Sequence, residues 1–283
     1  MLDVEVIFDD NMEKYMGLLG EDISEDMKRE FYRAYGVVGD DSAEGVIVYE
    51  LCNFDNEDED TKSRIRWLKS DNDEALDLLH KTYKEEGVFG EEIKESSYWL
   101  SEEKSAASCE RAGFSKEVKE DETVTMTLED ALEIPYVAKA KKLPEYICGI
   151  DKLSVEQFRT AIKDALFSGK KGALEDIGYL QKEWFENSVS ACTITDNKVN
   201  GLFLIRKTAS GIMEPVLLEA SGPDSERHLA WMIAYAIKKG QELYPPETTI
   251  RIRRSRKEIT ALVGKLFPKV KGKEAFFGTR KEE

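Results

Sequence analysis

The sequence predicts an α/β protein made of two tandem units, and three observations support this. One order of elements, β-α-α-β-β-β-α-β-α-β, occurs twice at a spacing of about 150 residues. Residues 1–150 hold 39 acids and 18 bases, whereas residues 151–283 hold 18 acids and 23 bases. Net charges of −21 and +5 thus make up the total of −16. A segment with Ile134-Pro135 and Leu143-Pro144 separates the halves. A single large sheet with alternating elements is the alternative.

The first unit is expected over residues 1–130. Gly39-Asp40-Asp41 lies between two β-rich runs and predicts a hairpin turn. The acidic run 53–61 predicts an exposed loop, and Gly113 is the expected C-cap of a short helix. Strands are expected at residues 4–8, 36–38, 45–51, 63–68, 96–100 and 123–128. Helical segments are expected around residues 27–35, from about 71 to 86 and at 102–111.

Residues 131–145 are expected to form a linker, and the second unit to span residues 146–283. The polar turn Asp196-Asn197-Lys198 predicts a second tight hairpin. Strands are expected at residues 146–150, 188–195, 201–207, 214–221, 248–253 and 274–279. Helices are expected at residues 154–167, 173–185, 225–239 and 256–266.

Composition excludes several classes of protein. Hydrophobic residues at 41% can build a core, and no apolar run reaches the roughly 20 residues of a membrane span. The first residues lack a secretory signal, so a cytoplasmic protein is expected. Four cysteines lie far apart, and with only His80 and His228 in the chain we expect no metal site. The acidic excess argues against general nucleic-acid binding and indicates a solvated module or attraction between oppositely charged halves or chains.

The most informative segment runs from the strand EPVLLEAS through the turn GPDSER into the helix HLAWMIAYAIKKG. Backbone N–H groups and the helix dipole converge where such a strand meets a helix, and this favours an anion. Asp224 and Glu226 lie at the same helix start and have the wrong charge for a phosphate. The junction therefore predicts an anion site that contains two opposing acids.

The order of elements and its motifs resemble the GNAT acyltransferase superfamily, over nearly the whole chain and as two tandem domains. The hairpin SVSACTITDNKVNGLFLIRK resembles the paired strands of the family. The strand EPVLLEAS with its helix resembles the cofactor segment, and SYWLSEEKSAASCERAGF resembles the helix that ends in Gly-Phe, here Gly113-Phe114. The resemblance implies a mixed, mostly antiparallel sheet in each domain. It also implies that the parallel strands at residues 215–221 and 248–253 are splayed at their C-terminal ends.

The resemblance implies that acetyl-CoA or another acyl-CoA is the co-substrate. It assigns cofactor contacts to Leu217, Leu218, Ala220, Gly222, Ser225 and Arg227. Asp71 and Asp73 in the first unit, and Asp224 and Glu226 in the second, stand where the family has phosphate-binding glycines. Carboxylates there repel phosphates by roughly 1 kcal/mol each and stabilise the helix start by about 0.3–1 kcal/mol. At both junctions the acidic residues thus stabilise the helix N-terminus but make the turn a poorer phosphate-binding loop.

The catalytic expectations are less specific. The tyrosine that serves the family as general acid is missing from both units, with Cys109 in its place in the first. Tyr98 and Tyr235 are candidate substitutes, and Glu219 is the candidate carboxylate facing the amine. Cys109 is a candidate nucleophile or a buried small residue. His228 is expected to cap or pack rather than transfer protons.

The densest basic run, residues 251–257, has three interpretations: a solvated strand end, a site for the 3′-phosphate of CoA, or a surface that docks on the acidic unit. Two functions follow from the whole sequence. One is acyl transfer from acyl-CoA to the amine of a small molecule or peptide, without nucleic acid or membrane partners, and with a homo-oligomer left open. The other is a catalytically inactive GNAT-fold binding or scaffold protein.

Overall fold

The computed structural model describes residues 2–28, 32–40, 42–52, 62–89, 93–167, 181–254 and 257–282. The chain divides into two compact units. Unit 1 comprises Met1–Asp121 together with Lys273–Glu283, and unit 2 comprises Glu122–Gly272. No helix in the described ranges combines the length and apolar character needed to cross a membrane.

Unit 1 is built on a seven-stranded mixed sheet with the order β1-β2-β3-β4-β5-β13-β6. All its neighbouring strands are antiparallel except β4 and β5. The strands are β1 (Leu2–Val6), β2 (Tyr32–Gly39), β3 (Ser42–Cys52), β4 (Lys62–Ser70), β5 (Glu95–Leu100), β6 (Glu117–Glu120) and β13 (Glu274–Lys281). The predicted hairpin at Gly39 is confirmed, because Gly39 pairs with Ser42 across the turn.

Helices cover both faces of the unit 1 sheet. On one face lie α3 (Asp73–Thr82), which continues as the π-helix η2 (Tyr83–Val88), and α4 (Glu103–Arg111). On the other face lie the 3₁₀ helix η1 (Met12–Tyr15), α1 (Met16–Leu19) and α2 (Glu21–Asp26). The helix expected around residues 27–35 is wrong where the structure describes it, since β2 begins at Tyr32. Alternating buried residues such as Tyr32 and Ala34 pack on the sheet there, which favours a strand.

Unit 2 is built on a six-stranded mixed sheet with the order β7-β12-β11-β10-β9-β8. Its strands are β7 (Thr123–Thr127), β8 (Ile147–Gly149), β9 (Ala191–Thr195), β10 (Lys198–Lys207), β11 (Met213–Ala220) and β12 (Thr249–Arg253). The predicted turn between β9 and β10 is confirmed. Asp196 and Asn197 have φ angles of 52° and 59°, as a type I′ turn requires, and Thr195 pairs with Lys198.

The unit 2 sheet is also covered on both faces. The long α8 (Ser225–Leu243) packs on one face with α5 (Leu128–Leu132) and α6 (Pro135–Lys139), and α7 (Val155–Phe167) packs on the other. The described part of the unit also contains the 3₁₀ helices η3 (Ile150–Lys152) and η5 (Lys182–Trp184) and the helix α9 (Lys257–Leu266). The acidic loop at residues 53–61 and most of the helix expected at 173–185 lie outside the described residues.

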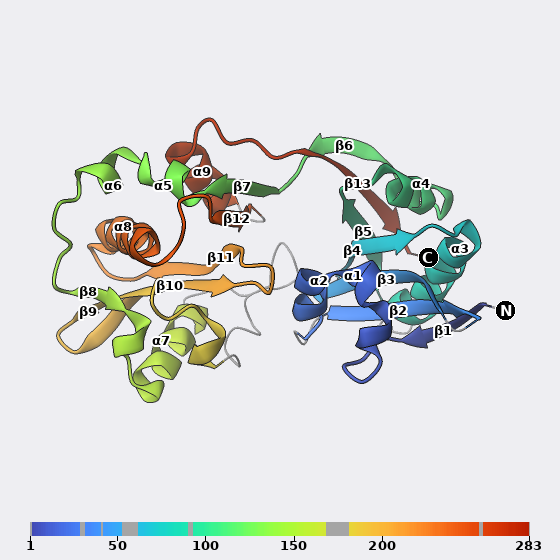
Figure 1. Cartoon of the computed structure of the whole chain (residues 1–283), viewed down its shortest axis with the longest axis horizontal. Helices are drawn as coiled ribbons and strands as arrows, with labels where there is room; N and C mark the ends of the chain where they lie inside the picture. Colours follow the sequence, from blue (N-terminus) through green and yellow to red (C-terminus); the bar gives the residue numbers. More distant parts are fainter. Residues whose placement is uncertain are drawn as a thin grey trace. The chain divides into compact units, whose positions relative to one another are not determined.

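Two strands lie in a different sheet from the one expected (Figure 1). The segment expected at residues 274–279 in the second unit is β13, which pairs with β5 and β6 in unit 1. The strand expected to end the first unit is β7, which pairs with β12 in unit 2. Residues 131–145, expected to form a linker, include the end of α5 and the whole of α6, with buried Ala131, Ile134 and Val137. The chain therefore crosses between units at 121–122 and again at 272–273.

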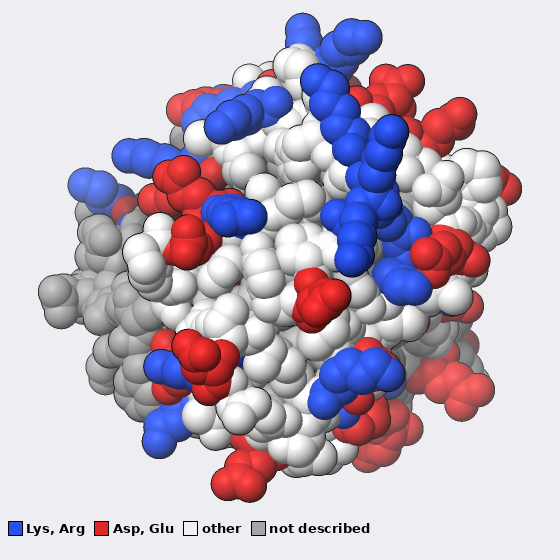
Figure 2. Space-filling view, turned by 90° about the vertical axis from the view of Figure 1, so that its left-hand side faces the viewer, with Lys and Arg blue, Asp and Glu red and all other residues white. Residues whose placement is uncertain are grey.

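Charge is divided unevenly between the units. Unit 1 holds 37 acids and 18 bases, a net charge of −19, and unit 2 holds 20 acids and 23 bases, a net charge of +3. On the side of unit 2 seen in Figure 2, Lys and Arg side chains are densest at the upper right, and Asp and Glu side chains are interspersed over the rest of the face. An anionic ligand is therefore attracted to unit 2 more than to unit 1.

Candidate functional site

The sheet of unit 2 opens between β11 and β12. These parallel strands pair at a single position, Met213 with Ile250, near the start of each strand. Beyond it, β11 stays paired with β10 as far as Ala220, while β12 stays paired with β7 as far as Arg253. The two strands therefore separate toward their carboxyl ends, as the family resemblance implied.

The start of α8 presents open backbone N–H groups beside this opening. Gly222 has a φ of 88° and turns the chain, and the Ser225 N–H donates to the Gly222 carbonyl at 3.2 Å. Asp224 is the N-cap residue, yet its side chain makes no capping hydrogen bond. The amides of Glu226 and Arg227 consequently have no acceptor among the described residues. Two open amides at the positive end of a helix form an anion-binding point.

The carboxylates of Asp224 and Glu226 weaken anion binding at the start of α8, but they do not occupy its backbone amides. The side chains of Asp224, Glu226 and Arg227 are all exposed. Each carboxylate opposes a nearby phosphate by roughly 1 kcal/mol, less where water screens it, and Arg227 offsets part of this. Among the predicted cofactor contacts, the structure brings Gly222, Ser225 and Arg227 together at the junction.

The other predicted cofactor contacts lie along β11 on alternate faces. Leu217 is buried in the core under α7, whereas Leu218 and Ala220 are half-buried and pack against the core under α8. Their side chains therefore support the helices, and the backbone of β11 borders the opening. The cofactor contacts remain predictions.

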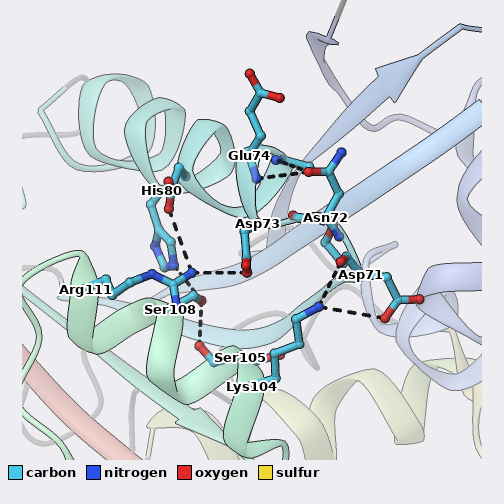
Figure 3. Close-up of polar contacts among 12 residues, drawn as sticks. Asp71, Asn72, Asp73, Glu74, His80, Lys104, Ser105, Ser108 and Arg111 are labelled. Atoms are coloured by element: carbon cyan, nitrogen blue, oxygen red, sulfur yellow. Dashed lines mark hydrogen bonds and ion pairs between the residues drawn. The ribbon is translucent and has the colours of Figure 1, made fainter.

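The corresponding junction of unit 1 is closed by its own side chains (Figure 3). The Asn72 side chain caps α3 and accepts from the amides of Glu74 at 3.0 Å and Ala75 at 3.4 Å. From α4, Lys104 Nζ donates to the Asp71 carbonyl at 2.9 Å, and Arg111 lies 3.4 Å from the Asp73 carboxylate and 4.0 Å from that of Asp77. The amides and the cations that could bind a phosphate are thus already engaged.

The opening between β4 and β5 in unit 1 is also filled. These strands pair only over residues 63–65 and 96–98, and then diverge. Ser105 of α4 donates to the Leu68 carbonyl of β4 at 2.6 Å. What remains is a hollow of about 20 Å³ lined by Arg66, Trp67, Leu68, Leu100, Ser101, Glu102 and Ser105. That volume suits about one water molecule.

The structure does not bring Glu219 and Tyr235 together. Glu219 is half-buried near the end of β11, on the same side as Leu217 because side chains alternate. Tyr235 lies ten residues after Ser225, about 15 Å farther along α8. Its hydroxyl faces Gly149 of β8, and burial, followed by the charge of Asp151, raises the pKa of Tyr235.

Tyr98 and Cys109 lie in the core of unit 1. Tyr98 is fully buried and packs edge-on against Phe114, with ring centroids 5.6 Å apart. Its hydroxyl has no hydrogen-bond partner among the described residues, and burial raises its pKa to about 12. Cys109 is also fully buried, and burial raises its pKa to about 12. Both environments disfavour the ionised form, which is typical of structural residues.

His228 is buried at the start of α8, and its ring lies 5.5 Å from the ring of Tyr146. This is the packing expected for it. In the part of the basic run 251–257 that the structure describes, Arg251 and Arg253 form ion pairs within unit 2, and its three interpretations stay predictions. Arg251 Nε lies 2.5 Å from Glu214, which also binds Arg206, and Arg253 Nε lies 2.6 Å from Glu122. These arginines tie neighbouring strands of unit 2 together.

Sequence reasoning missed the groups that distinguish the two junctions. Asn72 precedes an apolar helix and is a strong capping residue, so its role was readable from the sequence. Lys104 and Arg111 lie more than 30 residues from their acidic partners, and no local signal predicts those contacts.

Comparison with known proteins identifies the fold. No family model and no curated protein sequence matches the chain. Among solved structures, it is similar to a tandem GNAT protein from the clavulanic acid biosynthesis pathway, with 10% identity, a TM-score of 0.59, and 100% and 99% of the two chains covered. A probable N-acyltransferase of unknown function from Enterococcus faecalis has 13% identity and a TM-score of 0.55, with 100% and 73% covered.

A GCN5-related N-acetyltransferase from Sphaerobacter thermophilus has 12% identity and a TM-score of 0.53, with 100% and 96% covered. Similarity at these identities establishes a shared fold. The chain therefore has the tandem GNAT fold, with two mixed sheets flanked by helices, as the resemblance implied.

Proposed function

We propose that this chain, built on the tandem GNAT fold, transfers an acyl group from acyl-CoA, in the first place acetyl-CoA, to the amine of a small molecule or peptide. Unit 2 holds the acyl-CoA. The observation that carries this proposal is the pair of open amides at Glu226 and Arg227 beside the opening between β11 and β12. The net charge of unit 2 also suits the phosphates of CoA better than that of unit 1.

The start of α8 fits the pyrophosphate of acyl-CoA, and the edge of β11 fits its extended arm. The turn from Gly222 to Arg227 receives the pyrophosphate, and the free edge of β11 offers backbone groups to the extended arm. The thioester, when bound, supplies the activated acyl group. Catalysis then rests on positioning and on polarisation of the thioester carbonyl by a backbone N–H.

Glu219 is the candidate base for the attacking amine. Its place supports this role, because Glu219 is the next-to-last residue of β11, at the end where β11 is no longer paired with β12. Tyr235 is a weaker candidate acid, because its hydroxyl faces Gly149 rather than the junction. We expect Glu219→Gln to lower kcat with little change in KM for acyl-CoA.

Calorimetry with CoA and acetyl-CoA tests the proposal. Ligand at about 100 times Kd raises the free energy of unfolding by about 2.7 kcal/mol. Replacing Asp224 and Glu226 by their amides is expected to tighten binding by roughly fivefold per carboxylate, because each repulsion is worth roughly 1 kcal/mol. The matched unit 1 variant, with Asp71 and Asp73 changed to Asn, is expected to leave CoA affinity unchanged.

A catalytically inactive GNAT-fold binding or scaffold protein is the second candidate. The junction of unit 1 favours it, because the amides and cations there that could bind a phosphate already have partners within the unit. Absence of binding at millimolar CoA, in the parent protein and in the unit 2 amide variant, would establish this alternative.

A further inference from the structure

Acyl transfer leaves a pair of cysteines in unit 2 without a role. Cys148 of β8 and Cys192 of β9 are directly opposite each other in antiparallel strands. Their Sγ atoms are 3.5 Å apart, and both thiols are free. They are 44 residues apart in the sequence, so only the pairing of β8 with β9 brings them together.

The register of β8 and β9 brings the two cysteines within reach of a disulfide. Hydrogen bonds join Ile194 N–H to the Tyr146 carbonyl and Ile150 N–H to the Ser190 carbonyl, two residues to either side. Because hydrogen-bonded positions alternate along an antiparallel ladder, Cys148 and Cys192 form a hydrogen-bonded pair with Cα atoms about 5.5 Å apart. That separation is at the commonest value for disulfides, about 5.5–6 Å. The Cβ atoms of a hydrogen-bonded pair are about 5.5 Å apart, wider than the roughly 3.8 Å of a disulfide, so joining the two sulfurs requires both rotation of the side chains and a closer local approach of β8 and β9.

The two thiols have different surroundings, which assigns their roles. Cys192 is fully buried, whereas Cys148 is partly exposed on the edge strand β8. The hydrogen bond between the two sulfurs lowers the pKa of Cys148, and Lys152 lowers it further against the opposing effects of burial and Asp151. Cys148 is thus the accessible thiol that attacks first, and Cys192 is the buried thiol that attacks the mixed disulfide in the second step.

We propose that Cys148 and Cys192 are a redox-active dithiol that closes reversibly to a cross-strand disulfide by exchange with a low-molecular-weight disulfide such as oxidised glutathione. The Cys148 thiolate attacks one sulfur of that disulfide, forms a mixed disulfide and releases one thiolate. Cys192 then loses its proton to solvent and attacks the Cys148 sulfur, which releases the second thiolate. Two cysteine thiols are oxidised and one small disulfide is reduced to two thiols.

The bond would fasten the edge strand β8 to β9 and close the chain between them into a loop that contains η3 and α7. A covalent link across such a loop restricts the unfolded chain. We therefore expect oxidation to raise the midpoint of thermal unfolding by several degrees, and reduction with dithiothreitol to reverse the change.

The reduced full-length protein is incubated with oxidised glutathione and examined by intact mass and peptide mapping. The expected product has lost two hydrogens and contains one peptide pair linking Cys148 to Cys192. Cys192→Ser is expected to accumulate one glutathione on Cys148, and Cys148→Ser to leave Cys192 reduced. Cys109→Ser is the matched control, since Cys109 is buried in unit 1, and it is expected to form the same link as the parent.

Three outcomes would overturn the proposal. They are an unchanged Cys148 and Cys192 in the parent, a persistent glutathione adduct on parent Cys148, and a link between two molecules in a mixture of isotope-labelled and unlabelled protein. If Cys192→Ser does not fold, Cys192→Ala gives the same readout in a more apolar form, and circular dichroism checks the fold of every variant.

Discussion

Acidification is expected to destabilise unit 1 through one buried histidine. His80 lies on α3 at 5% exposure, and its Nε2 is 3.0 Å from the Ser108 hydroxyl oxygen. Burial, followed by the positive charges of Arg280 and Arg111, lowers the pKa of His80 from 6.5 to about 4. The neutral ring fits this environment and the imidazolium does not.

The sign and size follow from linkage between protonation and folding. Above pH 6.5 His80 is neutral in both the folded and the unfolded state, so its contribution to stability is complete. As the pH falls toward 4, His80 is protonated in the unfolded chain but stays neutral in the folded chain, and the free energy of unfolding decreases. A lowering of the pKa by about 2.5 units corresponds to about 3 kcal/mol, nearly all of it lost between pH 6.5 and 4.

Two measurements test this. The chain has only two histidines, so proton NMR of the imidazole Hε1 resonances, with His228→Gln for assignment, follows His80 directly. Urea unfolding of the parent and His80→Gln at a series of pH values isolates the histidine from the many carboxylates. The glutamine can keep a hydrogen bond to Ser108, and its free energy of unfolding is expected to fall by about 3 kcal/mol less on acidification. A His80 resonance that titrates near pH 6.5, or equal pH slopes for the two proteins, would refute the reasoning.

Two further substitutions test the helix start and the exchanged strand. Asn72→Ala is expected to lower the free energy of unfolding by about 1 kcal/mol through loss of the cap of α3. Asp224→Ala, which loses no capping hydrogen bond, should cost less in the same urea titration, and equal losses would contradict the assigned cap. Gly278→Ala is expected to destabilise unit 1 by about 3 kcal/mol, because the new Cβ would lie 1.8 Å from the Ser115 carbonyl oxygen. Gly264→Ala, a control with open space in α9, should stabilise by up to about 1 kcal/mol, and similar melting temperatures for the two variants would contradict this account.

The two units have kept one fold and have diverged at the same place. In unit 1, Asn72 and two cations from α4 satisfy the start of α3, and Ser105 bridges α4 to β4. In unit 2, the start of α8 has kept its amides open. The backbone amides at the start of α3 are therefore capped, whereas those of Glu226 and Arg227 at the start of α8 are open. The acids at both helix starts are compatible with this division, since they stabilise a helix whether or not a ligand binds.

Much of the fold was predictable because its signals are local. The turn at Asp196 and Asn197 requires positive φ, which those residue types tolerate, and the apolar spacing of Leu76 and Leu79 indicates the buried face of α3. The helix expected near residue 32 was wrong because propensity is weak beside the pairing of a strand between two neighbours. Tyr98 and Tyr235 were chosen as hydroxyls that could substitute for the missing tyrosine, and sequence alone does not determine which way a side chain points.

The sequence by itself determined the duplicated order of elements, the division of charge and the two acidic helix starts, because periodicity and composition are properties of neighbouring residues. Only the tertiary structure decided that β13 completes the first sheet and β7 the second, that α4 closes the junction of unit 1, and that Cys148 meets Cys192. Each of these depends on segments tens to hundreds of residues apart. Their pairing is set by competition among all strands and helix faces for burial and hydrogen bonds, which no local pattern records.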